Sequence, residues 1–221
     1  MQGELPHVSD AIQDYLKAIF TLGSEGERVT TSLLATRMGV TAPSATAMLK
    51  RLAALGLVEH VRYRGVLLTE AGERIALEVI RHHRLLERYL AEALGLPLEA
   101  LHAEADRLEH SLSEELEARI DELLGYPTHD PHGHPIPDSD LKFDRSEPRT
   151  LADLEPGDGA TVRQVPDDDP ELLRYLASLS LVPGTRLELR GVAPFGGPLT
   201  VRVDGDEHAV SRELAAAIGV A

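Results

Sequence analysis

The chain has 221 residues and a formal net charge of −15 at pH 7, and it contains no cysteine. The absence of cysteine excludes disulfides, thiolate metal ligands and a cysteine nucleophile. Tryptophan is absent and aromatic residues make up only 4% of the chain, which disfavours a platform that stacks sugars or bases. No apolar run reaches membrane-spanning length and the first residues do not resemble a secretion signal, so we expect a cytoplasmic protein without membrane contact.

The negative charge is unevenly distributed along the chain. Residues 28–74 carry a net charge of +4, whereas the segments before and after them are acidic. Nucleic acid binding requires Lys and Arg to displace counterions from phosphates, so only this stretch is suited to it.

The first 70 residues predict three helices and a hairpin. Apolar residues recur at helical spacing over 9–22, and a short second helix follows. Thr41 is a suitable N-cap for a third helix, with Pro43 in its first turn, and this helix ends at Gly56. Two short strands that turn at 63–65 complete the element order of a winged helix-turn-helix.

The next segment predicts a helical domain. A long amphipathic helix starts at Glu70 and closes at Gly95, and two further helices are expected over about 98–110 and 111–124. These helices are too few to form a large core of their own, so we expect a dimer interface here. Residues 125–140 are rich in Pro, Gly and His and are expected to form a loop.

After about residue 149 the pattern changes to short alternating strands broken by Pro-Gly and Asp-Gly turns, with one helix over about 169–180. This pattern predicts a small β-barrel of SH3-like size. The whole chain is therefore predicted to be mainly α-helical with a small β domain. Its expected divisions are a winged-helix domain (1–72), a helical dimerisation and metal-binding domain (73–138), a linker (139–149) and an SH3-like domain (150–221).

Metal-ligand residue types recur at helical spacing in the middle segment. His102, Asp106, Glu109 and His110 would share one helix face, which gives two imidazoles and two carboxylates in register. A divalent cation would satisfy all four, and a solvated polar face is the alternative.

A second pair of such residues, His83 and Glu87, lies four residues apart on the preceding long helix. Antiparallel packing of the two helices would bring this pair alongside the first group. The neighbouring His82 is rotated by about 100° and is expected at the surface. Imidazole and carboxylate ligands without sulfur suit Mn²⁺ or Fe²⁺ better than copper or a thiolate-type zinc site.

The Pro-rich loop holds a further group of histidines, His129, His132 and His134, beside Asp130. Such a group can bind adventitious metal. A loop of this composition is expected at the surface, so these residues are not among the predicted ligands.

The predicted winged helix has side chains suited to DNA. Thr41, Ser44 and Thr46 stand at the start of its third helix, where groove contacts are made. Basic residues suited to phosphate contacts follow on this helix and at the hairpin tip: Lys50, Arg51, Arg62 and Arg64. Because all of them fall in the basic stretch, DNA binding is predicted.

Together these segments resemble the diphtheria toxin repressor family of metal-dependent transcriptional regulators. The resemblance rests on DYLKAIFTL, VTAPSATAMLKRLAALGLV, YRGVLLTEAG, HHRLLERYL, LHAEADRLEH and DPHGHPIP, which occur in the family's order and cover nearly the whole chain. It implies a winged helix, a helical dimerisation and metal domain, and a C-terminal SH3-like (FeoA-type) barrel. It also implies a homodimer that binds palindromic double-stranded operator DNA when metal-loaded and represses metal-uptake genes.

The resemblance further implies two metal sites. The ligands of the primary site would be Asp14, Asp106, Glu109 and His110. The ligands of the ancillary site would be His83, Glu87 and His102, with Gln164 and Asp167 of the barrel as further candidates.

The chain departs from the family pattern at positions that bear on the metal. Iron-sensing members have Met and Cys where this chain has Asp14 and Asp106, whereas manganese sensors have carboxylates there. This difference favours Mn²⁺, with Fe²⁺ as the alternative. Lys17 stands where short manganese sensors place an acidic ligand, which argues against a closely spaced binuclear pair of their kind.

On the DNA side, Ala47 replaces a family glutamine that can meet bases. Base contacts would then fall to the small residues at the start of the helix, in part through thymine methyl groups. These residues are Thr41, Pro43, Ser44 and Thr46.

Two other functions stay open from the sequence. A metal-dependent hydrolase could use the face from His102 to His110, but no HExxH motif, nucleophile elbow or evident general base accompanies it. A metal-buffering or interaction protein without DNA binding would fit the overall acidity.

Overall fold

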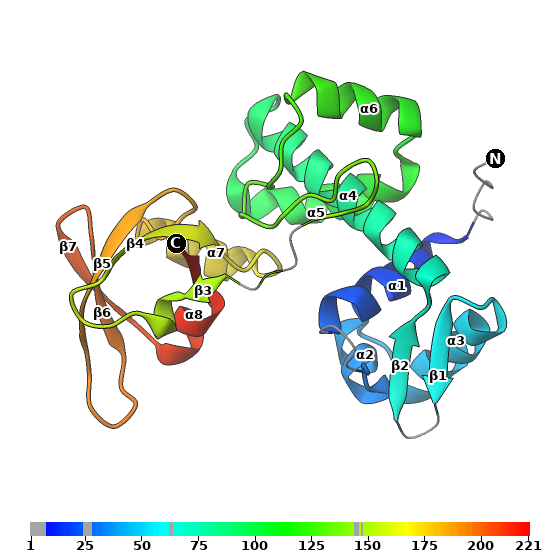
Figure 1. Cartoon of the computed structure of the whole chain (residues 1–221), viewed down its shortest axis with the longest axis horizontal. Coiled ribbons are helices and arrows are strands. Elements are labelled where there is room, and N and C mark those ends of the chain that lie inside the picture. Colours follow the sequence, from blue (N-terminus) through cyan, green and yellow to red (C-terminus); the bar gives the residue numbers. More distant parts are fainter. Residues whose placement is uncertain (1–7, 24–27, 62–63, 144–145, 147) are drawn as a thin grey trace. The chain divides into compact units, whose positions relative to one another are not determined.

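The computed structural model describes residues 8–23, 28–61, 64–143, 146 and 148–221. Figure 1 labels the helices and strands of the chain. The chain divides into two compact units. The first consists of residues 1–82 with 137–141, and the second of residues 83–136 with 142–221. Among the described residues, no helix is long and apolar enough to cross a membrane.

The first unit is a winged helix-turn-helix. Its elements are α1 (Asp10–Leu22), α2 (Thr31–Arg37), α3 (Ala42–Ala54), β1 (Val58–Val61), β2 (Gly65–Leu68) and the first half of α4 (Glu70–Glu92). The predicted cap of α3 is confirmed, because the Thr41 hydroxyl accepts a hydrogen bond from the backbone N–H of Ser44. The two strands pair antiparallel, with Val58 opposite Leu68.

The core of this unit is formed by leucines spaced along its helices. Leu16 of α1, Leu34 of α2, and Leu49 and Leu52 of α3 are fully buried. The start of α3 lies at the surface of this unit, where Thr41, Pro43 and Ser44 are exposed. The recognition face predicted from the sequence is therefore presented to solvent.

The second unit begins with a helical part. It contains the second half of α4, then α5 (Leu98–Leu108), the 3₁₀ turn η1 (Glu109–Ser111) and α6 (Glu114–Leu123). Leu85, Leu86, Ala105 and Ile120 pack together at its centre. The sequence predicted a continuous helix through residue 110, but α5 ends at Leu108 and the next three residues tighten into a 3₁₀ turn.

The rest of the second unit is the predicted small β domain. Its elements are β3 (Arg149–Thr150), η2 (Leu151–Asp153), β4 (Gly159–Gln164), α7 (Pro170–Ser178), β5 (Arg186–Val192), β6 (Leu199–Val203), β7 (Asp206–Val210), α8 (Arg212–Ala217) and β8 (Gly219–Val220). The strands form one antiparallel sheet in the order β3-β8-β4-β5-β6-β7. Helix α8 was not predicted, because its six residues are too short to show helical periodicity, and Ser211 caps it through the Leu214 N–H.

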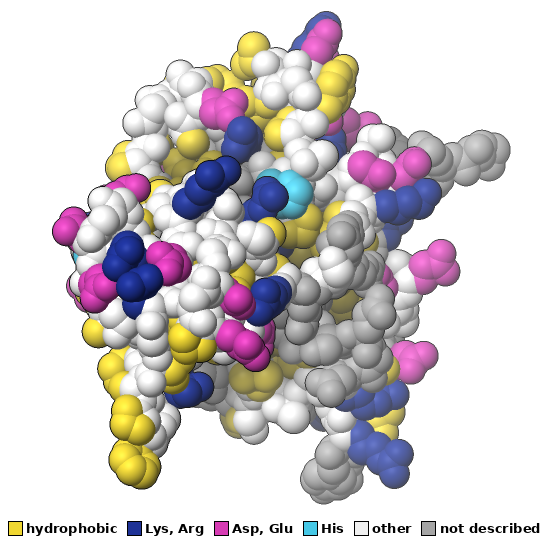
Figure 2. Space-filling view, turned by 60° about the vertical axis from the view of Figure 1, so that its left-hand side comes forward, with side chains coloured by type: hydrophobic (Ala, Val, Ile, Leu, Met, Phe, Trp, Pro, Cys, Tyr) yellow, Lys and Arg dark blue, Asp and Glu magenta, His cyan; other side chains and the backbone are white. Residues whose placement is uncertain are grey.

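Charged side chains on the sheet are mixed in sign. Arg190 pairs with Glu188, and Arg202 pairs with Glu207, all of them exposed or half-exposed. Figure 2 shows basic and acidic side chains interspersed on the face that it displays.

Candidate metal centre

The second unit gathers metal-ligand side chains around Glu87 of α4, whose exposed fraction is 0%. Its carboxylate Oε1 lies 3.0 Å from His83 Nε2, on the preceding turn of the same helix. The same oxygen lies 3.6 Å from His102 Nδ1 of α5. The predicted approach of this pair to the α5 group is therefore confirmed.

The other oxygen of Glu87 faces residues from outside the helices. Oε2 lies 3.5 Å from Nδ1 of His132, in the loop after α6. One ligand atom from each of Glu87, Asp130, His132 and Asp167 lies within 4.8 Å of all the others. We call these four residues the loop cluster. Ligand atoms bound at about 2.0–2.6 Å on opposite sides of one cation would be about 4–5 Å apart, so this spacing suits a single ion.

Several polar atoms of this region have no hydrogen-bond partner among the described residues although they are buried. They are Glu87 Oε2, Asp130 Oδ2, His132 Nδ1 and His134 Nδ1. A buried polar atom left unpaired costs about 1–3 kcal/mol. Three of these atoms belong to the loop cluster and each can donate a lone pair, so a divalent cation fits the residues present.

Hydrogen bonds within the loop fix the orientation of its two ligands. Oδ1 of Asp130 accepts the backbone N–H groups of His132 and His134, both at 2.9 Å, and this leaves Oδ2 to face the cluster. Nε2 of His132 lies 3.2 Å from the Leu98 carbonyl oxygen. Because that nitrogen is the donor to a carbonyl, Nδ1 carries the free lone pair in the neutral ring.

The loop also contacts β4 and so brings in the fourth ligand. The His132 carbonyl oxygen accepts the Val165 N–H at 2.9 Å. Gly133 has a φ of +95°, and a Cβ at this position would lie 1.8 Å from the Arg163 carbonyl oxygen, so only glycine allows this approach. Asp167 follows β4, and its Oδ2 lies 3.6 Å from His134 Nδ1.

The charges in the cluster shift one another's protonation. Burial would raise the pKa of the Glu87 carboxyl, but the adjacent imidazoles of His102, His132 and His83 hold that pKa well below its ordinary value. Burial would lower the pKa of His132, yet Glu87 and the nearby aspartates raise it above its ordinary value. Glu87 is therefore ionised and ready to bind a cation at neutral pH.

His83 joins a second group of ligand-type residues. Its Nδ1 lies 2.5 Å from Glu109 Oε2 and 3.3 Å from Asp106 Oδ1, and its Nε2 lies 3.0 Å from His102 Nδ1. Ligand atoms of His83, His102 and Asp106 also lie within 4.8 Å of one another. Glu109 is buried, and its Oε1 lies 3.6 Å from Nε2 of His110. The structure thus brings the predicted ligands of the second unit's helices together.

The structure gives the positions of two other predicted ligands, Asp14 and Gln164, but not their role. Asp14 is half-buried on α1 of the first unit, and Gln164 is half-buried at the end of β4. Their assignment as ligands stays a prediction.

Two predictions about histidines are wrong. His82 was expected at the surface but is only 9% exposed. His132 was expected in a surface loop but is 0% exposed, because the loop packs against Leu98 and Val165. The available signal was the segment DPHGH, in which Asp130, His132 and His134 alternate around a glycine.

The predicted DNA-binding residues lie on α3 and the hairpin. The hydroxyls of Thr41 and Ser44 lie 2.9 Å apart, and Thr46 donates to the Ala42 carbonyl oxygen at 2.8 Å. The predicted phosphate contacts that the structure describes are all exposed: Lys50, Arg51 and Arg64. Arg62 lies outside the described residues.

Three family models match this chain. They describe the iron dependent repressor N-terminal DNA binding domain (residues 7–66), the iron dependent repressor metal binding and dimerisation domain (69–138) and the FeoA domain (149–221). The iron-dependent repressor IdeR of Mycobacterium tuberculosis (strain H37Rv) is 32% identical over 224 residues, which cover 96% of each chain. The diphtheria toxin repressor of Corynebacterium efficiens is 32% identical over 219 residues, which cover 92% of this chain and 95% of that protein. This chain belongs to the diphtheria toxin repressor family.

A solved structure of a relative agrees with this assignment. A manganese-dependent transcriptional repressor in complex with manganese matches with a TM-score of 0.86 and 40% identity, over 95% of this chain and 98% of that one. Members of the diphtheria toxin repressor family are metal-dependent, DNA-binding transcriptional repressors and not enzymes, so the hydrolase alternative is wrong. The predicted fold, a winged helix followed by a helical domain and an SH3-like domain, is confirmed.

Proposed function

We propose that this chain is a manganese-responsive homodimeric repressor that binds palindromic operator DNA when loaded with metal. The observation that carries the proposal is the loop cluster, in which three carboxylates and one imidazole converge with unpaired atoms. Oxygen-rich ligand sets without sulfur favour Mn²⁺ over softer ions. The solved manganese-dependent relative supports this choice, and Fe²⁺ is the alternative because IdeR relatives are named as iron-dependent.

The ligands divide into groups. Glu87, Asp130, His132 and Asp167 would hold one ion, and His83, His102 and Asp106 offer a second position. Asp14, Glu109, His110 and Gln164 stay predicted ligands through the family resemblance. A bound ion would supply two positive charges that neutralise buried carboxylates, and this chain's own loop and helices would supply the geometry.

Helix α4 is the element through which metal can affect DNA binding. It is continuous from Glu70, directly after the wing, to Glu92, and its second half carries His83 and Glu87. An ion that fixes these side chains restricts the conformations open to the helix. A coupling of about 1–3 kcal/mol would change operator affinity by about 5–150-fold.

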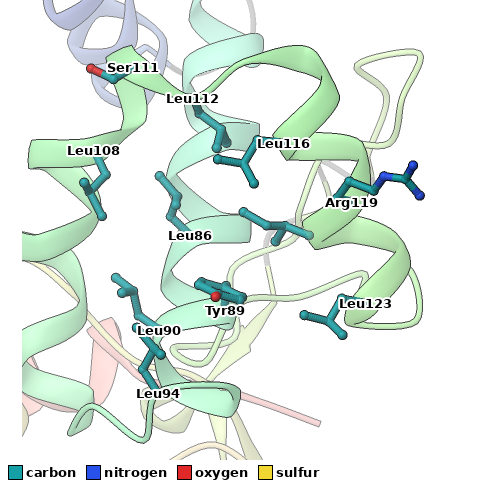
Figure 3. A pocket seen from close by; sticks show the side chains of 11 residues that line it. Leu86, Tyr89, Leu90, Leu94, Leu108, Ser111, Leu112, Leu116, Arg119 and Leu123 are labelled. Carbon is teal, nitrogen blue, oxygen red and sulfur yellow. The ribbon is translucent and has the colours of Figure 1, made fainter.

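The helical part of the second unit presents an apolar groove of about 390 Å³. Figure 3 shows leucines of α4, α5 and α6 and of the turn after α4 around it. The leucines with the largest exposed fractions are Leu94 (57%), Leu108 (43%), Leu116 (51%) and Leu123 (68%). Exposed leucines clustered in this way mark an interaction surface. We assign a second copy of this chain as the occupant, because the matching family model describes a dimerisation domain.

The DNA-binding face is the start of α3 with the basic residues that follow it. Thr41, Ser44 and Thr46 would meet bases, and Lys50, Arg51 and Arg64 would contact phosphates. A dimer with two such faces binds two half-sites related by twofold symmetry, which is the reason to expect a palindromic operator.

The test is a titration of Mn²⁺, anaerobic Fe²⁺ and Zn²⁺ while operator binding is measured, with DNA from the protein's own genomic neighbourhood at fixed salt. Mn²⁺ is expected to raise operator affinity at lower free concentration than Fe²⁺. Asp167→Asn should weaken this response, whereas Asp168→Asn, a change of the neighbouring exposed carboxylate, should leave it intact. Operator binding that does not respond to any metal would overturn the proposal.

A further inference from the structure

We propose that Arg84 is a positioning residue of the loop cluster, whose fixed positive charge makes a divalent cation the ion that balances the site. This inference rests on the proposed function, since it concerns how the loop cluster binds a metal. Arg84 would not touch the ion. It would set the charge that the ion meets and hold the loop that carries two of the ligands.

Arg84 lies between the helix and the loop. It follows His83 on α4 and stands three residues before Glu87, on the same helix face. Its Nη1 donates a hydrogen bond to the Pro135 carbonyl oxygen, and its Nε lies 3.8 Å from Oδ2 of Asp130. The guanidinium therefore connects α4 to both the backbone and a ligand of the loop.

The position of Arg84 is buried for a charged group. Its side chain is only 19% exposed, and the Asp130 side chain beside it is 0% exposed. A buried charge is strongly destabilising unless opposite charges compensate it. Burial lowers the pKa of the Arg84 guanidinium, and the carboxylates of Asp130, Asp167 and Glu87 act against this shift by electrostatic attraction.

The charge count in the cluster points to the valence of the ion. The three ionised carboxylates carry three negative charges and Arg84 carries one positive charge, so two negative charges are left uncompensated. One divalent cation with a neutral His132 brings the sum to zero, whereas a monovalent ion leaves a negative charge and a trivalent ion adds a positive one. Uncompensated charge is costly in a buried site, so Arg84 shifts the preference from trivalent to divalent ions.

The hydrogen bond to Pro135 gives Arg84 its second role. It ties the end of the loop to α4, while Asp130 and His132 lie a few residues earlier in the same loop. A lysine would keep the charge but present a single ammonium group in place of the planar guanidinium fork. The two contributions can therefore be separated by substitution.

The experiment measures Mn²⁺ and Tb³⁺ binding to the full chain by calorimetry. The binding event that disappears in Asp167→Asn is assigned to the loop cluster. In Arg84→Met, the ratio of Tb³⁺ affinity to Mn²⁺ affinity is expected to rise at least about tenfold, because a unit charge a few ångströms away acts more strongly on the trivalent ion. Arg84→Lys should leave the ratio within about threefold of the parent, since it keeps the charge. Arg88→Met is the matched control, because Arg88 pairs with Glu92 one turn along the helix, and it should not change the ratio.

A compensating variant keeps the test decisive if Arg84→Met alone does not fold. Arg84→Met combined with Asp130→Asn removes one charge of each sign and retains an oxygen ligand, so the ratio should return to the parent value. Two results would overturn the role of Arg84 without affecting the proposed metal site. One is an unchanged affinity ratio in Arg84→Met, and the other is a ratio in the double variant that differs from the parent ratio by tenfold or more. A parent protein from which Asp167→Asn removes no binding event would instead overturn the proposed function.

Discussion

Glu87 Oε2 and His132 Nδ1 face each other across 3.5 Å, one from the middle of a long helix and the other from a Pro-rich loop. Both side chains are fully buried, and neither atom has a hydrogen-bond partner within the part of the chain that the structure describes. In the neutral His132 ring both atoms carry lone pairs, so a cation could bind both.

Glu87→Gln should weaken Mn²⁺ binding at least about tenfold, because it removes the charge at the centre of the loop cluster while keeping its volume. The binding isotherm of Mn²⁺ by calorimetry measures this effect. Glu92→Gln is the control on the same helix, since Glu92 pairs with Arg88 near the surface. Equal losses in the two variants would show that Glu87 is not a ligand.

Mn²⁺ binding should release protons, and release should increase as the pH is lowered toward the pKa of His132. Burial would lower that pKa, but Glu87 and the nearby aspartates raise it above its ordinary value in the metal-free protein. In the metal-free protein the protonated ring contributes stability below its unfolded pKa, and this contribution is lost as the pH rises through the folded pKa. Metal needs the neutral ring, so apparent Mn²⁺ affinity should fall with falling pH.

Calorimetry in buffers of different ionisation enthalpy measures the protons released per ion. His129→Asn is the control for this measurement, because His129 is exposed in the same loop and should not alter the release. A heat of binding that is independent of buffer at every pH would contradict the prediction.

Leu116→Asp and Leu123→Asp should convert the proposed dimer to a monomer and reduce operator binding. Each substitution replaces an exposed leucine of the apolar groove by a charged carboxylate, and binding of a second copy would have to remove water from that carboxylate. Light scattering coupled to size-exclusion chromatography reports the mass. Phe195→Ser, at a side chain that is fully exposed, controls for the loss of surface hydrophobicity, and the prediction fails if the leucine variants remain dimers.

Lys50→Ala and Arg51→Ala should each weaken DNA binding by about the same factor on specific and non-specific sequences. If each side chain neutralises one phosphate, the slope of log affinity against log salt should decrease by about 0.9 for each contact removed. Fluorescence anisotropy over a range of salt concentrations gives the slope. Arg107→Ala, an exposed arginine of α5, should not change it. Loss of preference for the operator alone would mean that these residues read bases instead.

Local signals made much of this fold predictable. The N-cap at Thr41 and the helical spacing of Leu49 and Leu52 are signals that involve only residues close together in the sequence. The position of α3 could therefore be predicted from the sequence. The contact between His83 and His102 was also predictable, because it needs only two adjacent helices with ligands at helical spacing.

Long-range contacts made the rest unpredictable. His132 is buried where its ring contacts the Leu98 carbonyl oxygen and its own carbonyl oxygen accepts the Val165 N–H. Nothing in the loop's own composition indicates either contact. Likewise, α5 ends at Leu108, whereas the sequence predicted that this helix continues through Glu109 and His110. The end of the helix depends on how the surrounding residues accommodate the 3₁₀ turn. The local pattern identified the ligand types but not the full set of elements that bring them together.

The hydroxyl of Thr46 has one hydrogen, and it is donated to the Ala42 carbonyl oxygen. Toward a base in the major groove, Thr46 can therefore offer only its methyl group and its oxygen lone pairs. The methyl group matches the C5-methyl of thymine. An operator position that faces Thr46 should therefore favour thymine, and this preference should disappear when uracil is incorporated in its place, because the two bases differ there by that methyl group alone.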